Sequence, residues 1–324
     1  MHPPLSELLA TARVVSLPLA VKFRGIWSRE IMLFQGPEGW TEFSPFVEYN
    51  DDEAVHWLRA ALEFGWQPLP KLYRDEIMVN ATVPAVAPDQ VAEVLSHFDG
   101  CRTAKVKVGE PGQLLNEDVE RVREVRRILG PEGRIRVDAN GVWNVDEAEH
   151  AFHALAEFDL EYVEQPCASL EELAELRQRT HYMDVPIAAD ESIRKAEDPR
   201  AVAQAVAADV LVLKAQPLGG ISKIVELSEE VALPIVLSSA LESSVGIAMG
   251  LYAAAAVKEL DYDCGLGTAS LLVGDVTETP VVAQGGSIAV QRPVVSEDLL
   301  ERFAASPDTT AWWLERLERC YNLL

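Results

Sequence analysis

The sequence predicts an α/β protein in which a barrel of parallel strands follows a smaller α+β domain. From about Met78 onward, short segments rich in β-branched residues alternate with amphipathic helical segments. This alternation is typical of parallel strands joined by crossover helices, and eight strand-like segments suggest a closed barrel. The residues before Met78 lack the alternation, so we expect them to form a domain of their own.

The first domain is expected to contain a hairpin and a helix. Residues 14–46 have the pattern of strands and turns, and a Gly- and Pro-containing turn at 35–39 separates the apolar runs 31–34 and 40–43. Apolar runs on both sides of such a turn predict a hairpin. Residues 51–64 begin with acidic residues and then place apolar residues at helical spacing, which predicts a capped helix.

The barrel strands are expected in order along the rest of the chain. They are predicted at residues 78–83, 104–108, 134–140, 160–166, 186–192, 210–216, 234–240 and, more weakly, 260–267. Helical patterns lie between them, for example at 116–129, 146–158, 169–179, 199–207 and 221–231. The chain after Ser270 becomes rich in glycine and proline, which fits a barrel without its last helix. The predicted architecture is a TIM-like (β/α)7β barrel.

Three segments follow from this pattern. Residues 1–77 are expected to form an α+β capping domain, residues 78–275 the modified barrel with the active site, and residues 276–324 a C-terminal segment. The end of this last segment, from Ser296 onward, looks helical and carries several aromatic side chains. We therefore expect it to pack back on the capping domain.

Composition and charge exclude several classes of protein. Lysine and arginine number 28 against 52 aspartates and glutamates, a formal net charge of −24. This field repels phosphate backbones and acidic lipid surfaces, so neither a nucleic-acid nor a membrane partner is expected. Widely spaced cysteines, no signal-peptide pattern and no apolar run of 18 residues lead us to expect a cytoplasmic protein. The sequence indicates no particular oligomeric partner.

Two lysines share one predicted strand. Lys105 and Lys107 are two residues apart, so their side chains point to the same face. Adjacent ammonium groups disfavour each other's charge. We therefore expect each lysine to lower the pKa of the other toward the range of a catalytic base.

Three carboxylates end the next three predicted strands. Asp138 precedes Glu164 by 26 residues, and Glu164 precedes Asp190 by another 26, one βα unit each. The carboxyl ends of barrel strands face the active site, so these oxygens should converge there. Such ligands suit a hard cation, and Mg²⁺ is expected. Lys214 follows 24 residues later and is expected on the side of the barrel opposite Lys107.

Simpler explanations exist for single residues of this pattern. A lone aspartate after a strand is often a helix N-cap, and a lone strand-end lysine is often merely solvated. Capping does not explain five positions in register over five consecutive βα units. Ser238 and Ser239 could contact a substrate carboxylate or cap a helix, and Gly267 could let backbone amides approach an anion or simply shape a turn.

These residues resemble the enolase superfamily, and within it the muconate-lactonising group. The matching segments are TAKVKV (103–108), VDANG (137–141), VEQP (163–166), ADES (189–192) and LKAQPLGG (213–220). The stretches FRGIWSRE (23–30), NATVPAV (80–86), SSALESSVGIA (238–248) and CGLGT (264–268) are similar to actinobacterial o-succinylbenzoate synthases. The resemblance covers essentially the whole chain.

The resemblance implies a lyase acting on a small anionic substrate. The expected reaction is the syn dehydration of 2-succinyl-6-hydroxy-2,4-cyclohexadiene-1-carboxylate to o-succinylbenzoate, in menaquinone biosynthesis, through a metal-stabilised enediolate. It implies Mg²⁺, with Mn²⁺ as a possible substitute, on the three carboxylates. Lys107 would be the base and then the acid, Lys105 would tune it and touch the substrate carboxylate, and Lys214 would stabilise charge over the ring. Asn140 is implied in substrate binding and Arg136 in supporting Asp138.

Other activities stay open at this point. Asp261 and Asp263 form an Asp-x-Asp pair of the kind that dipeptide epimerases of the same group use for the substrate ammonium, although the pair lies early on the predicted last strand. N-succinylamino-acid racemase or dipeptide epimerase activity is therefore the alternative. A barrel that only binds a ligand is a further alternative, but it predicts the loss of some of the five charged positions.

Overall fold

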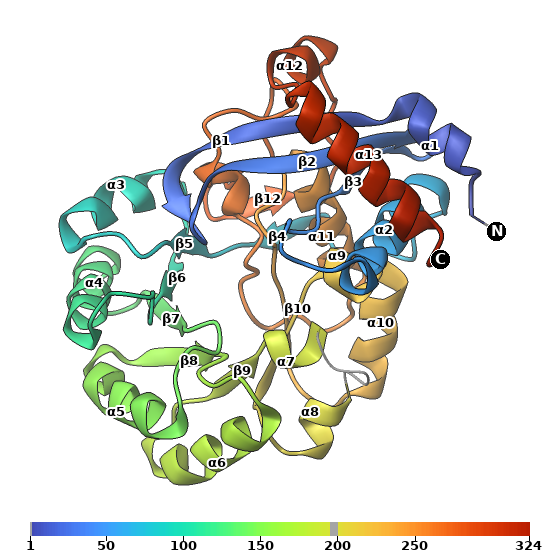
Figure 1. Cartoon of the computed structure of the whole chain (residues 1–324). Coiled ribbons are helices and arrows are strands. Elements are labelled where there is room, and N and C mark those ends of the chain that lie inside the picture. The colour runs from blue at the N-terminus through green and yellow to red at the C-terminus, as the bar shows by residue number, and fades with distance from the viewer. Residues whose placement is uncertain (1, 195–199) are drawn as a thin grey trace.

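The computed structural model describes residues 2–194 and 200–324. Figure 1 shows strands ringed by helices, with a separate antiparallel sheet lying across one end of the ring. The predicted combination of a parallel barrel with an α+β capping domain is confirmed.

The capping domain is a three-stranded antiparallel sheet with helices beside it. Its elements are α1 (Leu5–Thr11), β1 (Arg13–Phe23), β2 (Ile26–Gly36), β3 (Gly39–Phe43) and α2 (Asp51–Trp66). The predicted hairpin is confirmed, because Gly36 pairs with Gly39 across a two-residue turn. The predicted helix is also confirmed, and the Asn50 side chain caps it by accepting a hydrogen bond from the Glu53 amide at 2.9 Å. The sequence did not predict α1.

Seven parallel strands form the barrel sheet in sequential order. They are β5 (Ala81–Val83), β6 (Thr103–Lys107), β7 (Arg134–Asp138), β8 (Leu160–Glu164), β9 (Ile187–Ala189), β10 (Val210–Leu213) and β11 (Ile235–Leu237). Each lies within a segment that the alternation predicted, except that β6 begins one residue earlier, at Thr103. Their sequential order follows from the crossover helices, which return the chain to the same end of the sheet each time.

The eighth strand is shorter than predicted. Residues 260–267 form no regular strand, but the amide of Cys264 donates to the Met78 carbonyl and that of Gly265 to the Leu237 carbonyl, both at 2.8 Å. Since Met78 lies before β5 and Leu237 ends β11, these two residues bridge both edges of the sheet and close the barrel.

Helices follow the strands around the outside of the barrel. They are α3 (Val91–Ser96), α4 (Leu115–Leu129), α5 (Val145–Leu155), α6 (Leu170–Thr180), α7 (Glu191–Arg194), α8 (Ala201–Gln204), α9 (Ala215–Leu218), α10 (Ile221–Glu230) and α11 (Ser244–Ala256). Short 3₁₀ turns are η1 (Pro88–Gln90), η2 (Ala156–Phe158), η3 (His181–Met183) and η4 (Thr268–Leu271). The helix predicted at 199–207 is represented by the shorter α8, and Pro199 lies outside the described residues.

The barrel and the cap share one apolar core. α11 is buried along its whole length except at Tyr252, because it runs between the barrel and the capping sheet. Its 13 residues amount to only about 20 Å of helix. In the described part of the chain, no helix has the length and apolar character needed to cross a membrane.

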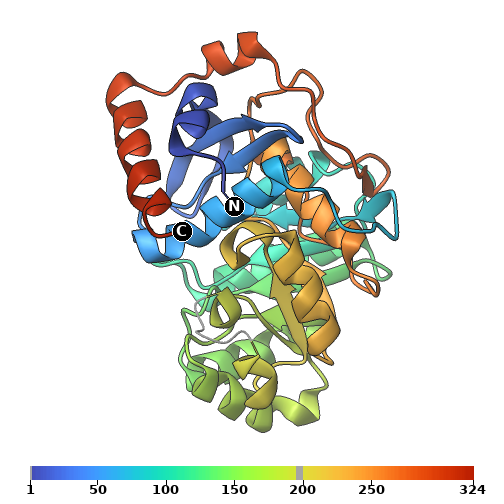
Figure 2. The same ribbon diagram turned by 90° about the vertical axis from the view of Figure 1, so that its right-hand side faces the viewer.

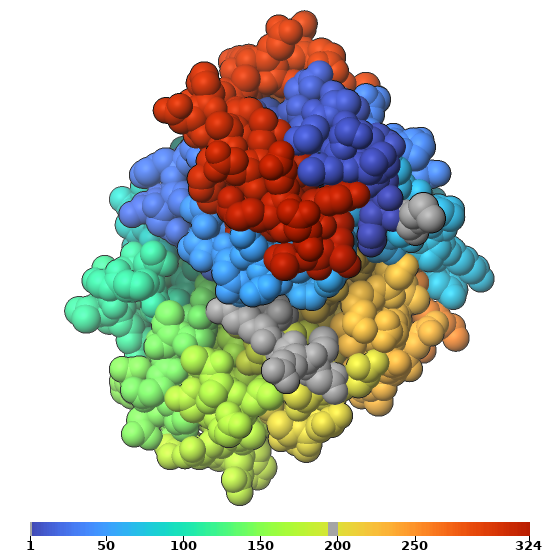
Figure 3. Space-filling view, turned by 45° about the vertical axis from the view of Figure 1, so that its right-hand side comes forward, coloured from blue at the N-terminus to red at the C-terminus, as the bar shows by residue number. Residues whose placement is uncertain are grey.

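The C-terminal segment returns to the capping domain. It contains β12 (Ser287–Ala289), paired with β4 (Glu76–Met78), then α12 (Glu297–Arg302) and α13 (Pro307–Tyr321). Trp313 of α13 is fully buried, stands edge-on to Phe43 with ring centroids 5.9 Å apart, and donates to Glu30 at 2.9 Å. Figure 2 shows the two ends of the chain close together, and in Figure 3 α13 covers the outer surface of the capping domain.

Candidate active site

The barrel register brings the predicted charged residues to one rim. Lys107 pairs with Asp138 across β6 and β7, and Asp138 pairs with Glu164 across β7 and β8. Asp190 and Lys214 each follow directly after the next two strands, β9 and β10. All of these residues therefore stand at the carboxyl ends of adjacent parallel strands, where barrel active sites are found.

The lysines neutralise the carboxylates in this structure. Lys105 Nζ lies 2.9 and 3.0 Å from the two Glu164 oxygens and 3.3 Å from Asp138 Oδ2. Lys107 donates to Asp138, and Lys214 pairs with Asp190. The three carboxylates are at most 1% exposed, so each buried negative charge has an ammonium partner.

The expected lowering of the Lys105 pKa is wrong for this arrangement. Burial alone would lower the pKa of Lys105, but Glu164 and Asp138 outweigh it and raise the pKa above its usual value. The prediction considered only the neighbouring lysine on the same strand. It omitted the carboxylates that the two following strands place within contact distance of the same ammonium group.

The carboxylates are also strongly perturbed. Burial, reinforced by the charge of Asp138, raises the pKa of Glu164 to about 7. Burial would likewise raise the pKa of Asp138, but Lys107 and Lys105 outweigh it and hold the pKa below its usual range. The charge of Asp190 also raises the pKa of Glu164, so Glu164 interacts electrostatically with both of the other carboxylates.

The donor set fits a hard divalent cation. Three buried carboxylates on consecutive strands offer oxygen ligands only, as Mg²⁺ and similar ions prefer. Across residues 2–194 and 200–324, however, no three acidic, imidazole or thiol groups stand ready to hold a metal ion as they lie. In this arrangement Lys105, Lys107 and Lys214 contact carboxylate oxygens that a cation would also need.

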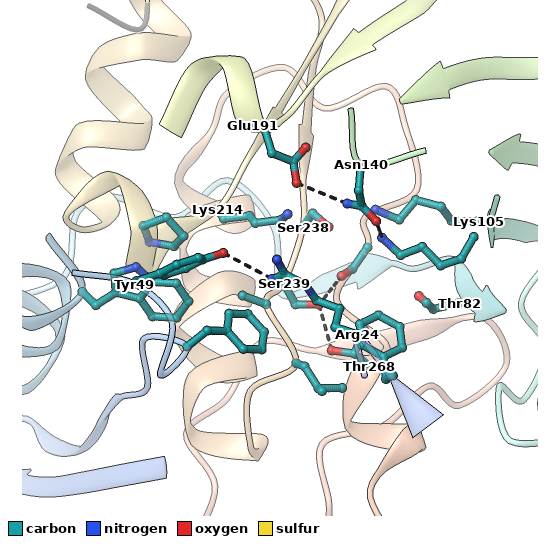
Figure 4. Close-up of a pocket in the computed structure, with 18 residues that line it drawn as sticks. Arg24, Tyr49, Thr82, Lys105, Asn140, Glu191, Lys214, Ser238, Ser239 and Thr268 are labelled. Atoms are coloured by element: carbon teal, nitrogen blue, oxygen red, sulfur yellow. Dashed lines mark hydrogen bonds between the residues drawn. The ribbon is translucent and has the colours of Figure 1, made fainter. Parts of the chain in front are cut away.

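A pocket opens above this charged rim. Its empty space, which includes a part open to solvent, amounts to about 550 Å³. Residues from both domains line it, as Figure 4 shows, and Lys214 and Lys105 stand on opposite sides of it. The ring of Phe23, from the capping sheet, lies 5.7 Å from Lys107 Nζ and covers that amine on one side.

Some of the predicted substrate contacts line this pocket. Asn140 does, and its side-chain oxygen accepts a hydrogen bond from Lys107 at 2.8 Å. Ser238 and Ser239 do as well, and the Ser239 hydroxyl is hydrogen-bonded to the Gly265 carbonyl at 2.6 Å and to the Thr268 hydroxyl at 2.8 Å.

The structure places two other predicted residues away from the pocket. Gly267 is not among the lining residues, and a side chain there would meet the Asn80 carbonyl and the Phe98 ring. Arg136 lies deeper in the barrel, where it donates to Asn80 and Glu161 and stacks on Tyr162.

Several lining residues escaped the sequence analysis. From the capping domain, Arg24 donates to the Tyr49 hydroxyl at 3.2 Å and stacks on Phe46 at 4.3 Å. From β5, Thr82 carries a buried hydroxyl for which the described residues supply no hydrogen-bond partner. Thr82 is the last residue but one of a predicted strand, close to the strand end as the charged residues are, but a single hydroxyl gives no distinctive signal. Nothing in the sequence pattern shows that Arg24 reaches a pocket of the other domain.

The Asp-x-Asp pair lies at the opposite end of the barrel. Asp263 accepts hydrogen bonds from the Thr103 hydroxyl at 2.6 Å and from Arg134 at 2.8 Å. Thr103 and Arg134 begin their strands, whereas the site lies where strands end. Asp263 is therefore engaged below the barrel core, and Asp261 is exposed on the same side.

Comparison with known proteins supports the same family throughout the chain. Residues 89–293 match the family described as Enolase C-terminal domain-like, and residues 14–65 match Enolase N-terminal domain-like. The o-succinylbenzoate synthase of Mycobacterium tuberculosis (strain H37Rv) is 54% identical over 323 residues, which cover 99% of this chain and 97% of that protein. The o-succinylbenzoate synthase of Mycobacterium marinum is 52% identical over 321 residues, covering 99% and 96%.

Solved structures show the same fold at lower identity. The muconate lactonizing enzyme from Pseudomonas putida superimposes with a TM-score of 0.75 at 20% identity, covering 91% of this chain and 98% of that one. An N-succinyl Arg/Lys racemase from Bacillus cereus gives 0.76 at 20% identity, covering 91% and 97%. With the barrel, the capping domain and the family matches in agreement, the chain belongs to the enolase superfamily.

Proposed function

We propose that the chain is an o-succinylbenzoate synthase, a lyase that dehydrates 2-succinyl-6-hydroxy-2,4-cyclohexadiene-1-carboxylate in the cytoplasm during menaquinone biosynthesis. The observation that carries this proposal is the 54% identity to the mycobacterial synthase over essentially both full lengths. The pocket supports it. In a chain with a net charge of −24, the pocket is lined by the cationic groups of Arg24, Lys105, Lys107 and Lys214, which suits a substrate with two carboxylates.

The cation is proposed to be Mg²⁺, with Mn²⁺ as a substitute. Asp138, Glu164 and Asp190 would hold it, because they are the buried oxygen donors of three consecutive strand ends. When bound, the ion would supply positive charge against the negative charge that develops on the substrate carboxylate. The three lysines would then be released from the carboxylates to face the substrate.

Lys107 is proposed as the base and the acid. As a neutral amine it would first take the proton from the carbon that carries the carboxylate, and the electron pair of that C–H bond would move onto the carboxylate. In the second step that electron pair would return to form the new ring double bond as the neighbouring C–O bond breaks. The same proton would leave with the hydroxyl as water, so Lys107 ends as it began. Because one amine serves both steps, proton and hydroxyl must leave from the same face of the ring.

The remaining groups are proposed to orient the substrate and to hold charge. Asn140 accepts a hydrogen bond from Lys107 and would keep its amine aimed at the pocket. Lys214, on the opposite side, would place an ammonium over the far face of the ring (Figure 4). The Phe23 ring beside Lys107 would cover the amine and keep water away from it.

The test is dehydration of the cyclohexadiene substrate by purified protein with Mg²⁺, followed by the absorbance of o-succinylbenzoate. Treatment with EDTA should abolish turnover, and Mg²⁺ should restore it. Lys107→Ala should reduce kcat by ~10²-fold or more, because a general acid–base group usually contributes ~10²–10⁴-fold. Lys223→Ala is the matched control, because Lys223 lies on the outer helix α10 and pairs with Glu226. Folded, metal-loaded protein without turnover would refute the proposal.

Racemisation of N-succinylamino acids is the second candidate. Lys107 and Lys214 both line the pocket, and Figure 4 shows Lys214 across the pocket from Asn140, the residue that accepts a hydrogen bond from Lys107. Removal and return of an α-proton on two faces requires two such groups. Incubation of N-succinylamino acids in D₂O, with detection of α-deuterium, tests this activity. The dipeptide epimerase alternative loses its sequence support, because Asp263 is engaged at the other end of the barrel.

A further inference from the structure

A buried polar network joins the capping domain to the barrel beside the pocket. It consists of Arg29, Glu42 and Ser44 from the cap and of Gln216, Glu242 and Ser243 from the barrel, and we call it the cap–barrel network. All six side chains are at most 4% exposed. The proposed mechanism assigns none of them a task, although buried charge is costly and usually retained for a reason.

Arg29 holds the loop that follows β11. Its guanidinium donates to the carbonyl of Leu241 at 3.2 Å and to that of Ala240 at 3.5 Å, and also to the Ser44 carbonyl within the cap. Leu241 has a positive φ of 63°, a left-handed conformation that is unfavourable for a residue other than glycine. The bonds from Arg29 fix the carbonyl groups on both sides of that strained position.

This loop is a wall of the pocket. Ser238, Ser239, Ala240 and Leu241 all line it, so a shift of the loop moves the surface that the substrate meets. Arg29 itself does not line the pocket, but its guanidinium stacks on the Phe46 ring at 4.1 Å, and Phe46 does. Arg29 therefore supports the pocket wall from both domains at once.

Glu42 holds the start of the helix behind the same loop. Its carboxylate accepts hydrogen bonds from the Ser243 amide at 3.1 Å, the Ser243 hydroxyl at 2.5 Å and the Gly246 amide at 3.0 Å. These groups belong to the N-terminus of α11, where backbone donors lack helical partners and the helix dipole favours a negative charge. A side chain at Gly246 would stand 2.8 Å from the Glu42 carboxyl carbon, so the approach requires glycine.

The network also reaches the element that carries Lys214. Gln216, two residues beyond Lys214, accepts a hydrogen bond from the Ser44 amide at 3.4 Å and donates to Glu242 at 3.5 Å. One set of buried contacts from the cap thus touches the strand end of Lys214 and the loop of Ser239.

We infer that Arg29 and Glu42 are positioning residues, through which the capping domain fixes the two barrel loops that carry Lys214 and Ser239 for catalysis. This inference rests on the proposed function. It also gives the N-terminal domain a task beyond covering the pocket. Displacement of reacting groups by about 1 Å can cost ~10²-fold in rate, so small losses of alignment are measurable.

The test compares wild type with Arg29→Lys, Glu42→Gln and Arg74→Ala. Arg74 is the matched control, because its guanidinium also donates to three backbone carbonyls of α11 and the residues after it, but at the far end of that helix, about 20 Å from the loop. For each variant, the melting temperature is measured first. The metal-binding stoichiometry and the kcat and KM for dehydration are then measured well below that temperature.

Arg29→Lys keeps the positive charge but loses the planar guanidinium, whose several N–H donors bond the carbonyl groups in a fixed geometry. We therefore expect kcat to fall ~10–100-fold and KM to rise. Glu42→Gln should lower kcat several-fold. Arg74→Ala should lower the melting temperature and leave kcat and KM within about two-fold of wild type. A purely structural role reduces the folded fraction and leaves KM unchanged, so the rise in KM separates the two explanations.

The inference is overturned if Arg29→Lys keeps wild-type kcat and KM, or if Arg74→Ala loses as much activity. Should Arg29→Lys fail to fold, Glu42→Gln decides alone, and unchanged kcat in that variant overturns the inference. Absence of turnover in the wild type would instead refute the proposed synthase activity, so the two failures are distinguishable.

Discussion

Replacement of Glu42 by glutamine should change how the stability of the protein depends on pH. Burial, reinforced by the nearby Glu242, raises the pKa of Glu42 from 4.5 to about 7, although hydrogen bonds from Ser243 and Ser44 and the charge of Arg29 oppose the rise. A carboxyl group whose pKa is higher in the folded state binds its proton more tightly there. Its contribution is therefore full below pH 4.5 and is lost as the pH rises through about 7.

The size of the effect follows from that difference. At about 1.36 kcal/mol per pKa unit, the change from 4.5 to about 7 corresponds to about 3 kcal/mol. Glutamine does not titrate. The stability of wild type relative to Glu42→Gln should therefore fall by up to about 3 kcal/mol between pH 5 and pH 8.

Urea unfolding of both proteins at pH 5 and pH 8 measures this directly. Comparison with the variant cancels the titration of distant groups, which both proteins share. Glu259→Gln, at an exposed position, is the control and should show no such dependence. The free energy of unfolding of wild type minus that of Glu42→Gln is the quantity to compare. If this difference is the same at pH 5 and pH 8, or is larger at pH 8, the assignment of a costly buried charge to Glu42 is incorrect.

Three further changes have defined outcomes. Lys214→Met should lower kcat ~30-fold, the equivalent of a desolvated cation–ring contact of about 2 kcal/mol, and a change below two-fold in a dehydration assay would contradict that role. Arg24→Met should raise KM about ten-fold with little loss of kcat, because one charge-assisted contact to a substrate carboxylate is worth about 1.5 kcal/mol; an unchanged KM would rule the contact out. Gly220→Ala should lower the melting temperature by several degrees, since the added carbon would stand 1.6 Å from a Glu63 oxygen at a φ of 132°. Gly112→Ala also has a positive φ but open space around it, so equal losses in both would exclude the clash as the cause.

The part of the site that lies on the barrel could be predicted from the sequence. Each strand end contributes one conspicuous charged residue, and the repeat of about 25 residues places those ends at one rim in any barrel of this kind. Asp138, Glu164 and Asp190 could be singled out for this reason. Their pairing with lysines could not, because it depends on which side chains reach across from one strand to the next.

The contribution of the cap could not be predicted in the same way. Arg24 and Tyr49 lie in a hairpin and a loop whose local pattern says nothing of the domain against which they pack. The length of the eighth strand was overestimated, because its local pattern does not show how the rest of the barrel is held. The other seven strands already fix both neighbouring edges, so the hydrogen bonds of only two residues, Cys264 and Gly265, are enough to close the ring.

The position of α13 has a consequence for the order in which the protein matures. Arg316 of this helix donates to the carbonyls of Phe46 and Tyr49, at 3.2 and 2.5 Å, and both residues line the pocket. These contacts join residues about 270 positions apart, so Phe46 and Tyr49 are translated long before the helix that binds their carbonyl groups. During synthesis the barrel strands emerge and can pair first. The wall that Phe46 and Tyr49 contribute to the pocket therefore lacks its contacts with Arg316 until residues beyond 307 have been translated, although every residue that lines the pocket has by then been made.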